Sequence, residues 1–205
     1  MDAGTLLAFF LTSLAIELTP GPNMAYLTVV GVTRGRVAGL YAVLGVAAGL
    51  ALLGAAAGFG LGQLVLENRV VYEVLRWGGA LYLLYLAWDA WRDGRKPLEG
   101  GPIDLSRWLF FRRGFITNLL NPKAALFYIA VLPSFVDPGR PPSGQLVTLV
   151  AIYVFAATLI HAAIVLLAAQ LQPMFERSGL RAGAGLFFAL LLVAIAIWLL
   201  VKTAQ

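Results

Sequence analysis

The sequence predicts an all-α membrane protein of six transmembrane helices, arranged as two inverted three-helix repeats in which helices 1 and 4 are broken. Three observations carry this prediction. The 205-residue chain is 60% apolar and only 12% charged, whereas a soluble domain carries about 25% charged residues. The apolar residues fall into six long runs, and roughly 20 such residues cross the hydrocarbon core of a bilayer. Prolines interrupt the first and fourth runs.

The six runs follow one another with few charges inside them. They comprise residues 5–32, 37–66, 70–91, 114–136, 145–175 and 182–201. Glu17 and Lys123 are the only charges in the first and fourth runs, and the second, fifth and sixth carry none. The third run contains Glu73, Arg76 and Asp89, which we interpret as ion pairs or snorkelling side chains near the span ends.

The pattern of an interrupted run, a long run and a shorter run occurs twice. We therefore expect one transmembrane domain over residues 1–205, with repeat 1 at about 1–93, a link at about 94–107 and repeat 2 at about 108–205. Because three helices is an odd number, the second repeat enters the membrane from the opposite side. Paired breaks in inverted repeats indicate a transporter site. The alternative is that these prolines serve packing only.

The breaks are "TPGPN" at 19–23 and "LLNPK" at 119–123. Pro20, Pro22 and Pro122 lack an N–H and clash with the carbonyl four residues earlier, so each frees a backbone oxygen. Gly21 adds conformational freedom at the bend. Backbone freed in this way must line protein or a wet cavity. The helix poles beside each break attract one anionic and one cationic group, and a zwitterionic amino acid carries both.

Three polar side chains flank the breaks and are candidate substrate ligands. Asn23 and Asn121 either bind substrate or cap the half-helices. The Lys123 ammonium either pairs with a carboxylate of the protein or holds the carboxylate of the substrate.

Glu17 and His161 are the candidates for proton coupling. Glu17 lies three residues before Pro20, and it is either a paired structural carboxylate or a group that takes up and releases protons. His161 is the only histidine. It is either a packing residue or a proton relay, since free imidazole titrates near neutral pH.

The positive residues predict the orientation. Ten of them belong to the loops opposite the termini, and four belong to the side of the termini. The ten are Arg34, Arg36, Arg92, Arg95, Lys96, Arg107, Arg112, Arg113, Arg177 and Arg181; the four are Arg69, Arg76, Arg140 and Lys202. Because cytoplasmic loops are enriched in Lys and Arg, we expect both termini outside the cytoplasm.

The charge, the absence of cysteine and the glycine patterns limit the functions and partners that the sequence allows. The net charge of +5 suits membrane anchoring better than nucleic-acid binding. The chain has no cysteine and no phosphate-binding loop, and we expect no cofactor, no metal and no cleaved signal peptide. The Gly-xxx-Gly patterns at 45–49 and 54–58 allow close helix contact, either within one chain or in a homodimer.

These residues resemble the LysE/RhtB family of bacterial amino-acid exporters. The resemblance rests on "TPGPNMAYLTVVGVTRGRVAGLYAVLGVAAG", "ALYLLYLAW" and "GFITNLLNPKAALFYIAVLPSFV", and it extends over nearly the whole chain. It implies export of amino acids or close derivatives across the bacterial inner membrane, driven by the proton-motive force. The family motif positions map to Pro20, Gly21, Pro22, Asn121, Pro122 and Lys123. Related members handle basic, hydroxylated or branched amino acids, so the resemblance names no single substrate.

Three other functions are weighed against this one. A membrane-embedded enzyme needs a clustered catalytic set, and a metal-ion exporter needs several His, Cys or carboxylate ligands. Only Glu17 and His161 are candidates for such ligands. A channel needs a continuous polar pore, whereas the polar residues gather at the two breaks. Accumulation by counterflow separates a transporter from a channel.

Overall fold

The computed structural model describes residues 1–58, 68–94, 103–177 and 181–202, and these residues form helices joined by short turns, with no strand among them. The elements are α1 (Ala3–Glu17), α2 (Pro22–Gly58), α4 (Arg69–Gly94), α5 (Ile103–Leu119), α6 (Pro122–Leu126), η1 (Phe127–Val131, a π-helix), η2 (Leu132–Phe135, a 3₁₀ helix), α7 (Pro142–Ala169), α8 (Gln172–Arg177) and α9 (Arg181–Lys202).

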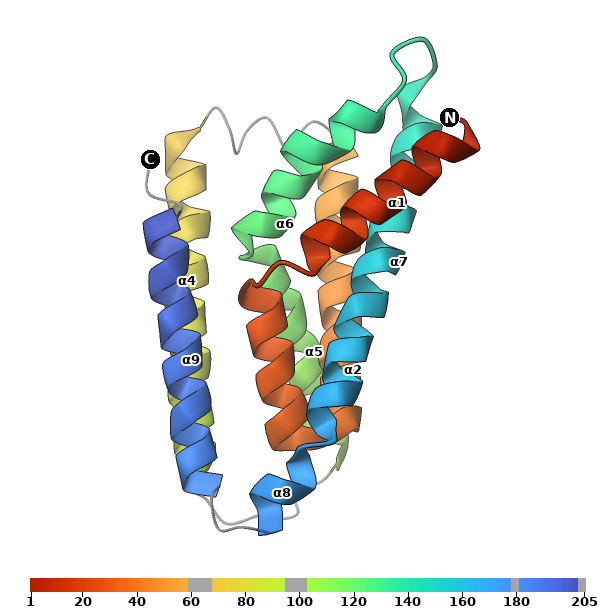
Figure 1. Cartoon of the computed structure of the whole chain (residues 1–205). Coiled ribbons are helices and arrows are strands. Elements are labelled where there is room, and N and C mark those ends of the chain that lie inside the picture. Colours follow the sequence, from red (N-terminus) through yellow and green to blue (C-terminus); the bar gives the residue numbers. More distant parts are fainter. Residues whose placement is uncertain (59–67, 95–102, 178–180, 203–205) are drawn as a thin grey trace.

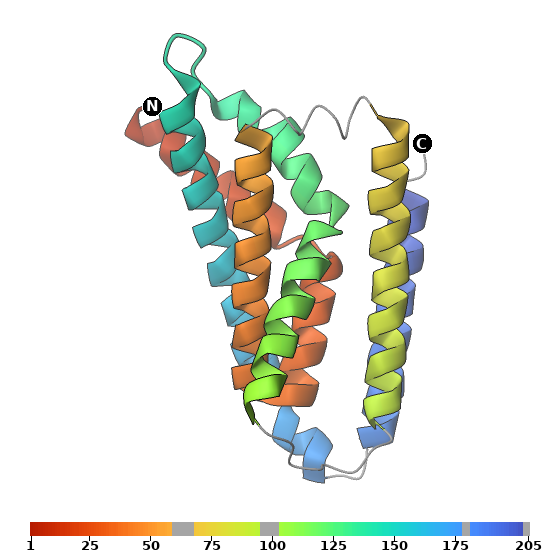
Figure 2. The same cartoon turned by 180° about the vertical axis from the view of Figure 1, so that it is seen from behind.

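The α2 segment consists of two helices that meet at Gly35. Gly35 has a φ of 77°, a left-handed conformation that only glycine adopts without strain. A side chain at this position would also overlap the amide of Gln172. Figures 1 and 2 show that the chain reverses direction there. The sequence separated residues 5–32 from 37–66 at this point because Arg34 and Arg36 interrupt the apolar pattern.

Both breaks lie midway along the molecule. In Figure 1, α1 runs from the end that carries Met1 to mid-height, and the first part of α2 continues to the opposite end. α5 rises from that opposite end to mid-height, and α6, η1 and η2 complete the path. The Gly35 turn, the end of α4, the start of α5 and α8 gather at the end remote from Met1. The side that faces the cytoplasm stays a prediction.

Glycines allow the closest helix contacts. α2 packs against α5 and α7, and α4 packs against α9. A Cβ at Gly45 would overlap the carbonyl of Phe111, and one at Gly49 would lie 2.9 Å from the amide nitrogen of Asn118. Gly54 abuts α7. Of the two alternatives for these patterns, Gly45, Gly49 and Gly54 therefore serve packing within the chain. A homodimer stays a prediction.

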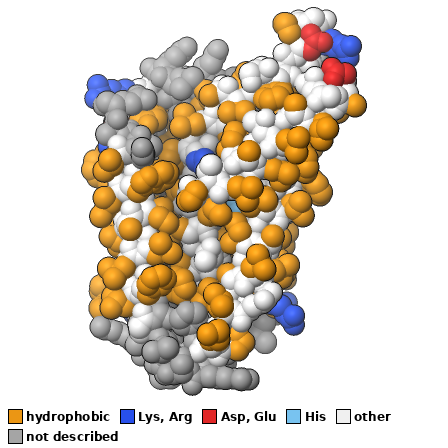
Figure 3. Space-filling model, viewed as in Figure 1, with side chains coloured by type: hydrophobic (Ala, Val, Ile, Leu, Met, Phe, Trp, Pro, Cys, Tyr) orange, Lys and Arg blue, Asp and Glu red, His pale blue; other side chains and the backbone are white. Residues whose placement is uncertain are grey.

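The described helices have the length and surface of membrane spans. By length and composition, Pro22–Gly58, Arg69–Arg92 and Pro142–Met174 are apolar enough to cross, although the first of these reverses direction at Gly35. Arg107–Leu119 with Pro122–Phe135 makes a fourth candidate, bent by 53°. Large apolar side chains cover the outside, with Val147 71% exposed. Figure 3 shows that apolar side chains cover most of the coloured surface between the two ends of this face, with a basic side chain visible midway down. The six-helix inverted-repeat arrangement stays a prediction.

One predicted boundary is wrong. The fifth run was expected to be one helix through residue 175, but α7 ends at Ala169 and α8 begins at Gln172. Pro173 explains this end, since its ring clashes with the carbonyl four residues earlier, that of Ala169. α5 begins at Ile103, inside the interval of about 94–107 that was expected for the link, and the extent of the link stays a prediction. Residues 59–66 of the second run and 95–102 of the link lie outside the described residues.

One cation assigned to the cytoplasmic loops lies inside the bundle. Arg113 of α5 donates a 2.6 Å hydrogen bond to Asp89 of α4, and the two side chains are only 14% and 10% exposed. Asp89 also lies 3.6 Å from Arg92. The ion pair between Asp89 and Arg113 therefore links α4, against which α9 packs, to α5.

Candidate functional site

The two breaks contact one another. α1 ends at Glu17 and α5 ends at Leu119, and the Lys123 ammonium donates a 2.9 Å hydrogen bond to the carbonyl oxygen of Thr19. Gly21 faces the same lysine, since a Cβ there would lie 3.4 Å from Lys123 Cδ. Figures 1 and 2 place both breaks side by side at mid-height. The two breaks therefore lie against one another in the fold.

Neighbouring groups satisfy the backbone carbonyls that Pro20 and Pro122 free. The carbonyl of Ile16 accepts hydrogen bonds from Thr19 N at 3.0 Å and from Thr19 Oγ1 at 2.6 Å. The carbonyl of Asn118 accepts from Asn121 N at 3.0 Å. Since an unsatisfied carbonyl costs several kcal/mol in hydrocarbon, these local bonds make the breaks tolerable. They also turn the Thr19 carbonyl toward Lys123.

The two asparagines at the breaks behave differently. Asn121 is an N-cap, because its side-chain oxygen accepts from Lys123 N at 3.1 Å. Asn23 lies one residue inside α2, and its amide donates a 2.8 Å hydrogen bond to the side-chain oxygen of Asn118 on α5. Asn23 Oδ1 and Asn118 Nδ2 are buried and have no hydrogen-bond partner among the described residues. This pair leaves one acceptor and one donor beside the crossing of the breaks.

Glu17 is the centre of a buried polar cluster. Its side chain is 5% exposed. Tyr153 OH donates to Oε1 at 2.6 Å, His161 Nε2 lies 3.2 Å from Oε2, and Lys123 Nζ lies 3.9 Å from Oε2. α1, α6 and α7 each contribute to the cluster. The two candidates for proton coupling and the one candidate cation for the substrate therefore lie within reach of one another.

The charge of Glu17 depends on the groups around it. An isolated carboxylate in an apolar interior is costly, so Glu17 needs the hydroxyl of Tyr153 and the cations around it. A proton on Glu17 removes the negative charge that attracts the Lys123 ammonium. Lys123 is the more accessible partner, with a side chain 22% exposed. The imidazole of His161 is 1% exposed, and neither of its ring nitrogens makes a hydrogen bond among the described residues, although Nε2 lies 3.2 Å from Glu17 Oε2.

The remaining predicted positions frame the cluster. Pro20 is exposed, whereas Gly21, Pro22 and Pro122 are buried at the crossing. Sequence reasoning missed Tyr153 and the side chain of Asn118. Tyr153 precedes His161 by eight residues on α7, and residues spaced by about two helical turns share a face, so the position of His161 could have indicated it. Among the described residues no three His, Cys, Asp or Glu side chains gather as metal ligands.

The helical fold and the site at its two breaks define a class of protein. The apolar exterior indicates a multi-pass helical membrane protein, and its two broken helices meet at a buried ionisable cluster, as in secondary transporters. The chain belongs to the LysE-type translocator family, whose model matches residues 14–203.

Several curated proteins that are similar to this chain are named as efflux or membrane proteins. A homoserine/homoserine lactone efflux protein of Salmonella typhi is 32% identical over 145 residues, which are 67% of this chain and 68% of the relative. A leucine efflux protein of Klebsiella pneumoniae is 31% identical over 159 residues, 75% of this chain and 71% of the relative. A Vibrio cholerae relative, 33% identical over 79% of this chain and 83% of its own length, carries the name of a membrane protein. No solved structure matches the chain.

Proposed function

We propose that this protein exports amino acids or close derivatives from the cytoplasm by proton antiport. The observation that carries the proposal is the contact of Glu17 with Lys123 at the crossing of the two breaks. Family membership and the efflux proteins among the relatives support the substrate class. The bacterial inner membrane as location and both termini outside are parts of the same proposal.

The proposed zwitterionic substrate replaces the ion pair between Glu17 and Lys123. These two groups lie 3.9 Å apart, which leaves their ion pair loose enough to be replaced by an amino acid that offers its ammonium to Glu17 and its carboxylate to Lys123. The poles of the broken helices add favourable fields of both signs. Asn23 and Asn121, with the backbone of Pro20, Gly21, Pro22 and Pro122, complete the proposed binding surface.

The same geometry explains antiport. Glu17 binds either a proton or the substrate ammonium, because protonation removes the charge that attracts the ammonium. Mutual exclusion at one carboxylate links the two affinities reciprocally. A proton that arrives from outside therefore displaces the amino acid outward, and release of the proton inside restores the site. Tyr153 and His161 hold Glu17 in place through either step.

The test is transport in reconstituted vesicles without nucleotide. Purified protein is incorporated into liposomes, and accumulation of labelled leucine and homoserine is followed with and without an imposed pH gradient. The expected result is that the amino acid accumulates against its own concentration gradient only when the pH gradient drives protons in the opposite direction. Equilibration without accumulation would indicate a channel, and accumulation driven by another ion would retain export but reject proton antiport.

A further inference from the structure

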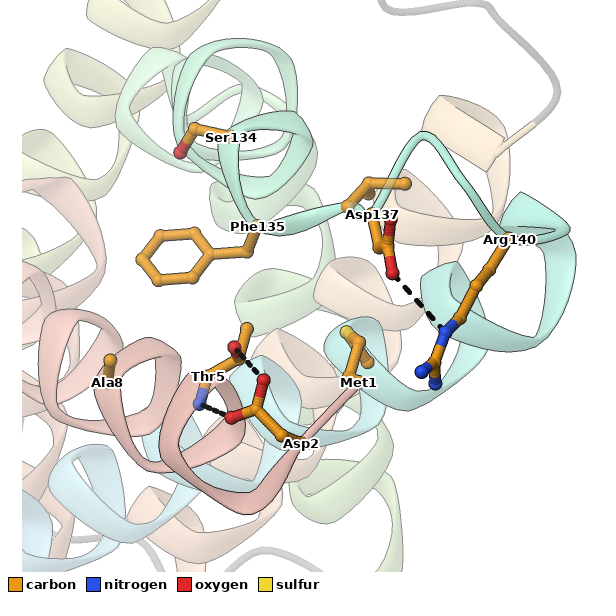
Figure 4. Close-up of a pocket in the computed structure, with 9 residues that line it drawn as sticks. Met1, Asp2, Thr5, Ala8, Ser134, Phe135, Asp137 and Arg140 are labelled. Atoms are coloured by element: carbon orange, nitrogen blue, oxygen red, sulfur yellow. Dashed lines mark hydrogen bonds and ion pairs between the residues drawn. The ribbon is translucent and has the colours of Figure 1, made fainter.

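A pocket of about 500 Å³ opens at the end of the molecule that carries Met1, away from the Glu17 cluster. Figure 4 shows its walls: Asp2, Thr5 and Ala8 at the start of α1, and Ser134, Phe135 and Arg140 of η2 and the turn that follows. The ring of Phe135 reaches from η2 toward α1. The pocket therefore lies between the outer halves of the two broken helices.

A line of aromatic rings connects this pocket with the buried carboxylate. The ring of Phe135 lies 5.0 Å from that of Phe9, and Phe9 lies 5.8 Å from Phe127. Phe127 stacks on Tyr153 with ring centroids 3.6 Å apart. The Tyr153 hydroxyl then donates to Glu17. Four rings thus fill the space from the pocket floor to the ionisable cluster.

The buried face of α1 follows the same line. Phe9, Ser13 and Glu17 recur every four residues and are the buried positions of this helix. Phe9 and Ser13 are both 0% exposed. Apolar constrictions of this kind exclude water and close a transport route by dewetting. The neighbouring π-helix η1 carries Phe127, and short π-helical turns are frequent at functional sites.

The pocket presents both signs of charge to a departing solute. Arg140 and Asp137 form an exposed ion pair at 3.3 Å. Hydrogen bonds from the backbone N–H and the hydroxyl of Thr5 hold the pKa of the Asp2 carboxyl below its usual value, so Asp2 stays ionised near neutral pH. A zwitterionic amino acid finds partners here for its ammonium and its carboxylate.

We propose that this pocket is the outer vestibule of the export route, which receives zwitterionic amino acids, and that Phe9, Phe127 and Phe135 form its closed gate above Glu17. The inference rests on the proposed export function and on its orientation. Tyr153 belongs to both the gate and the cluster, because it stacks on Phe127 and donates to Glu17. A change of charge on Glu17 is thereby transmitted to the rings that close the route.

Cysteine labelling tests the vestibule and the gate separately, since the chain has no native cysteine. The reaction rate of Ser134→Cys measures how accessible the pocket is, and that of Ser13→Cys measures how accessible the space behind Phe9 is. Each is placed in the parent, in Phe9→Ala and in Phe10→Ala, and is treated from outside with a membrane-impermeant thiol reagent. Phe10 is the matched control, because it neighbours Phe9 but stacks on Phe155 at 6.4 Å instead of joining the gate.

The expected result is rapid labelling of Ser134→Cys in all three backgrounds. Ser13→Cys should label slowly in the parent and in Phe10→Ala, and about tenfold faster or more in Phe9→Ala, because a closed route opens only as a minor state. Val46→Cys, which is buried elsewhere, reports unfolding. If it reacts in Phe9→Ala, the comparison is made with the milder Phe9→Met.

Two outcomes overturn the inference. Equal labelling of Ser13→Cys in all backgrounds shows that Phe9 closes nothing, and absence of outside labelling at Ser134→Cys shows that the pocket is not an outer vestibule. Both are independent of the vesicle assay. Labelling as expected without amino-acid transport leaves the gate in place and rejects only the proposed function.

Discussion

Tyr153 of α7 donates a 2.6 Å hydrogen bond to Oε1 of Glu17, which lies 136 residues earlier at the end of α1. The bond joins the broken first helix to a helix of the second half. The ring of Tyr153 stacks on Phe127. Its hydroxyl binds the carboxylate of Glu17, to which both Lys123 and His161 are close. Tyr153 is therefore the residue through which packing and charge at this site are connected.

Removing the hydroxyl of Tyr153 should impair coupling without disturbing the ring stack. A hydrogen bond to a charged acceptor contributes about 1.5–3 kcal/mol, so Tyr153→Phe should reduce pH-driven efflux about tenfold or more. Tyr128→Phe is the control, since this buried hydroxyl donates to the carbonyl of Leu50 and not to Glu17. The measurement is efflux as a function of pH. The same pH profile in both variants would assign Tyr153 a packing role only.

Removing the ammonium of Lys123 should weaken recognition of the substrate carboxylate. Lys123→Ala should abolish or severely reduce efflux of free leucine, whereas transport of leucine methyl ester, which lacks the carboxylate, should fall much less. Lys123→Arg should also fail for leucine, because a planar guanidinium does not replace a compact ammonium. Competition between leucine and its ester in vesicles gives the comparison. An equal loss for both compounds would indicate that Lys123 only stabilises the crossing of the breaks.

Small changes at the α2–α5 contact should destabilise the fold. Gly45→Ala places a methyl group against the carbonyl of Phe111, and overpacking of this kind costs about 1–3 kcal/mol. Gly58→Ala is the matched change, because a Cβ there meets nothing within 4 Å. Reversible unfolding in mixed detergent micelles should show a lower free energy of unfolding for Gly45→Ala and little change in it for Gly58→Ala. Equal stabilities would mean that the helices separate more easily than this contact indicates.

The sequence predicted the parts of the site that carry a local signal. Prolines mark where α1 and α5 end, and a charge inside an apolar run identifies Glu17 and Lys123. The reversal at Gly35 was also readable, because Arg34 and Arg36 are costly in hydrocarbon. Each of these features depends on residues close together in the chain.

The parts that were missed depend on how the helices cross. The spacing to His161 places Tyr153 on the same face of α7 but does not show that its hydroxyl meets Glu17. Asn118 becomes a partner of Asn23 only because α2 and α5 meet closely. Arg113 was counted as a loop cation because its apolar run begins at residue 114, but α5 extends back to Ile103 and directs Arg113 toward Asp89. Periodicity and composition do not specify such contacts between distant segments.

Neutralising Glu17 should separate substrate exchange from proton coupling. Glu17→Gln keeps the size of the side chain and an acceptor for the substrate ammonium, and Tyr153 can still donate to its amide oxygen. The amide cannot take up a proton between the two faces of the membrane, however, so proton and substrate no longer compete. We expect vesicles with this variant to exchange external for internal leucine, more slowly than the parent, and to lose accumulation driven by a pH gradient. His161→Gln tests the alternative carrier of the proton. Its imidazole lies 3.2 Å from Glu17, so it should slow proton transfer without abolishing accumulation. The reverse pattern, in which Glu17→Gln accumulates leucine as well as the parent and His161→Gln does not, would assign proton coupling to His161 and leave Glu17 as its structural partner.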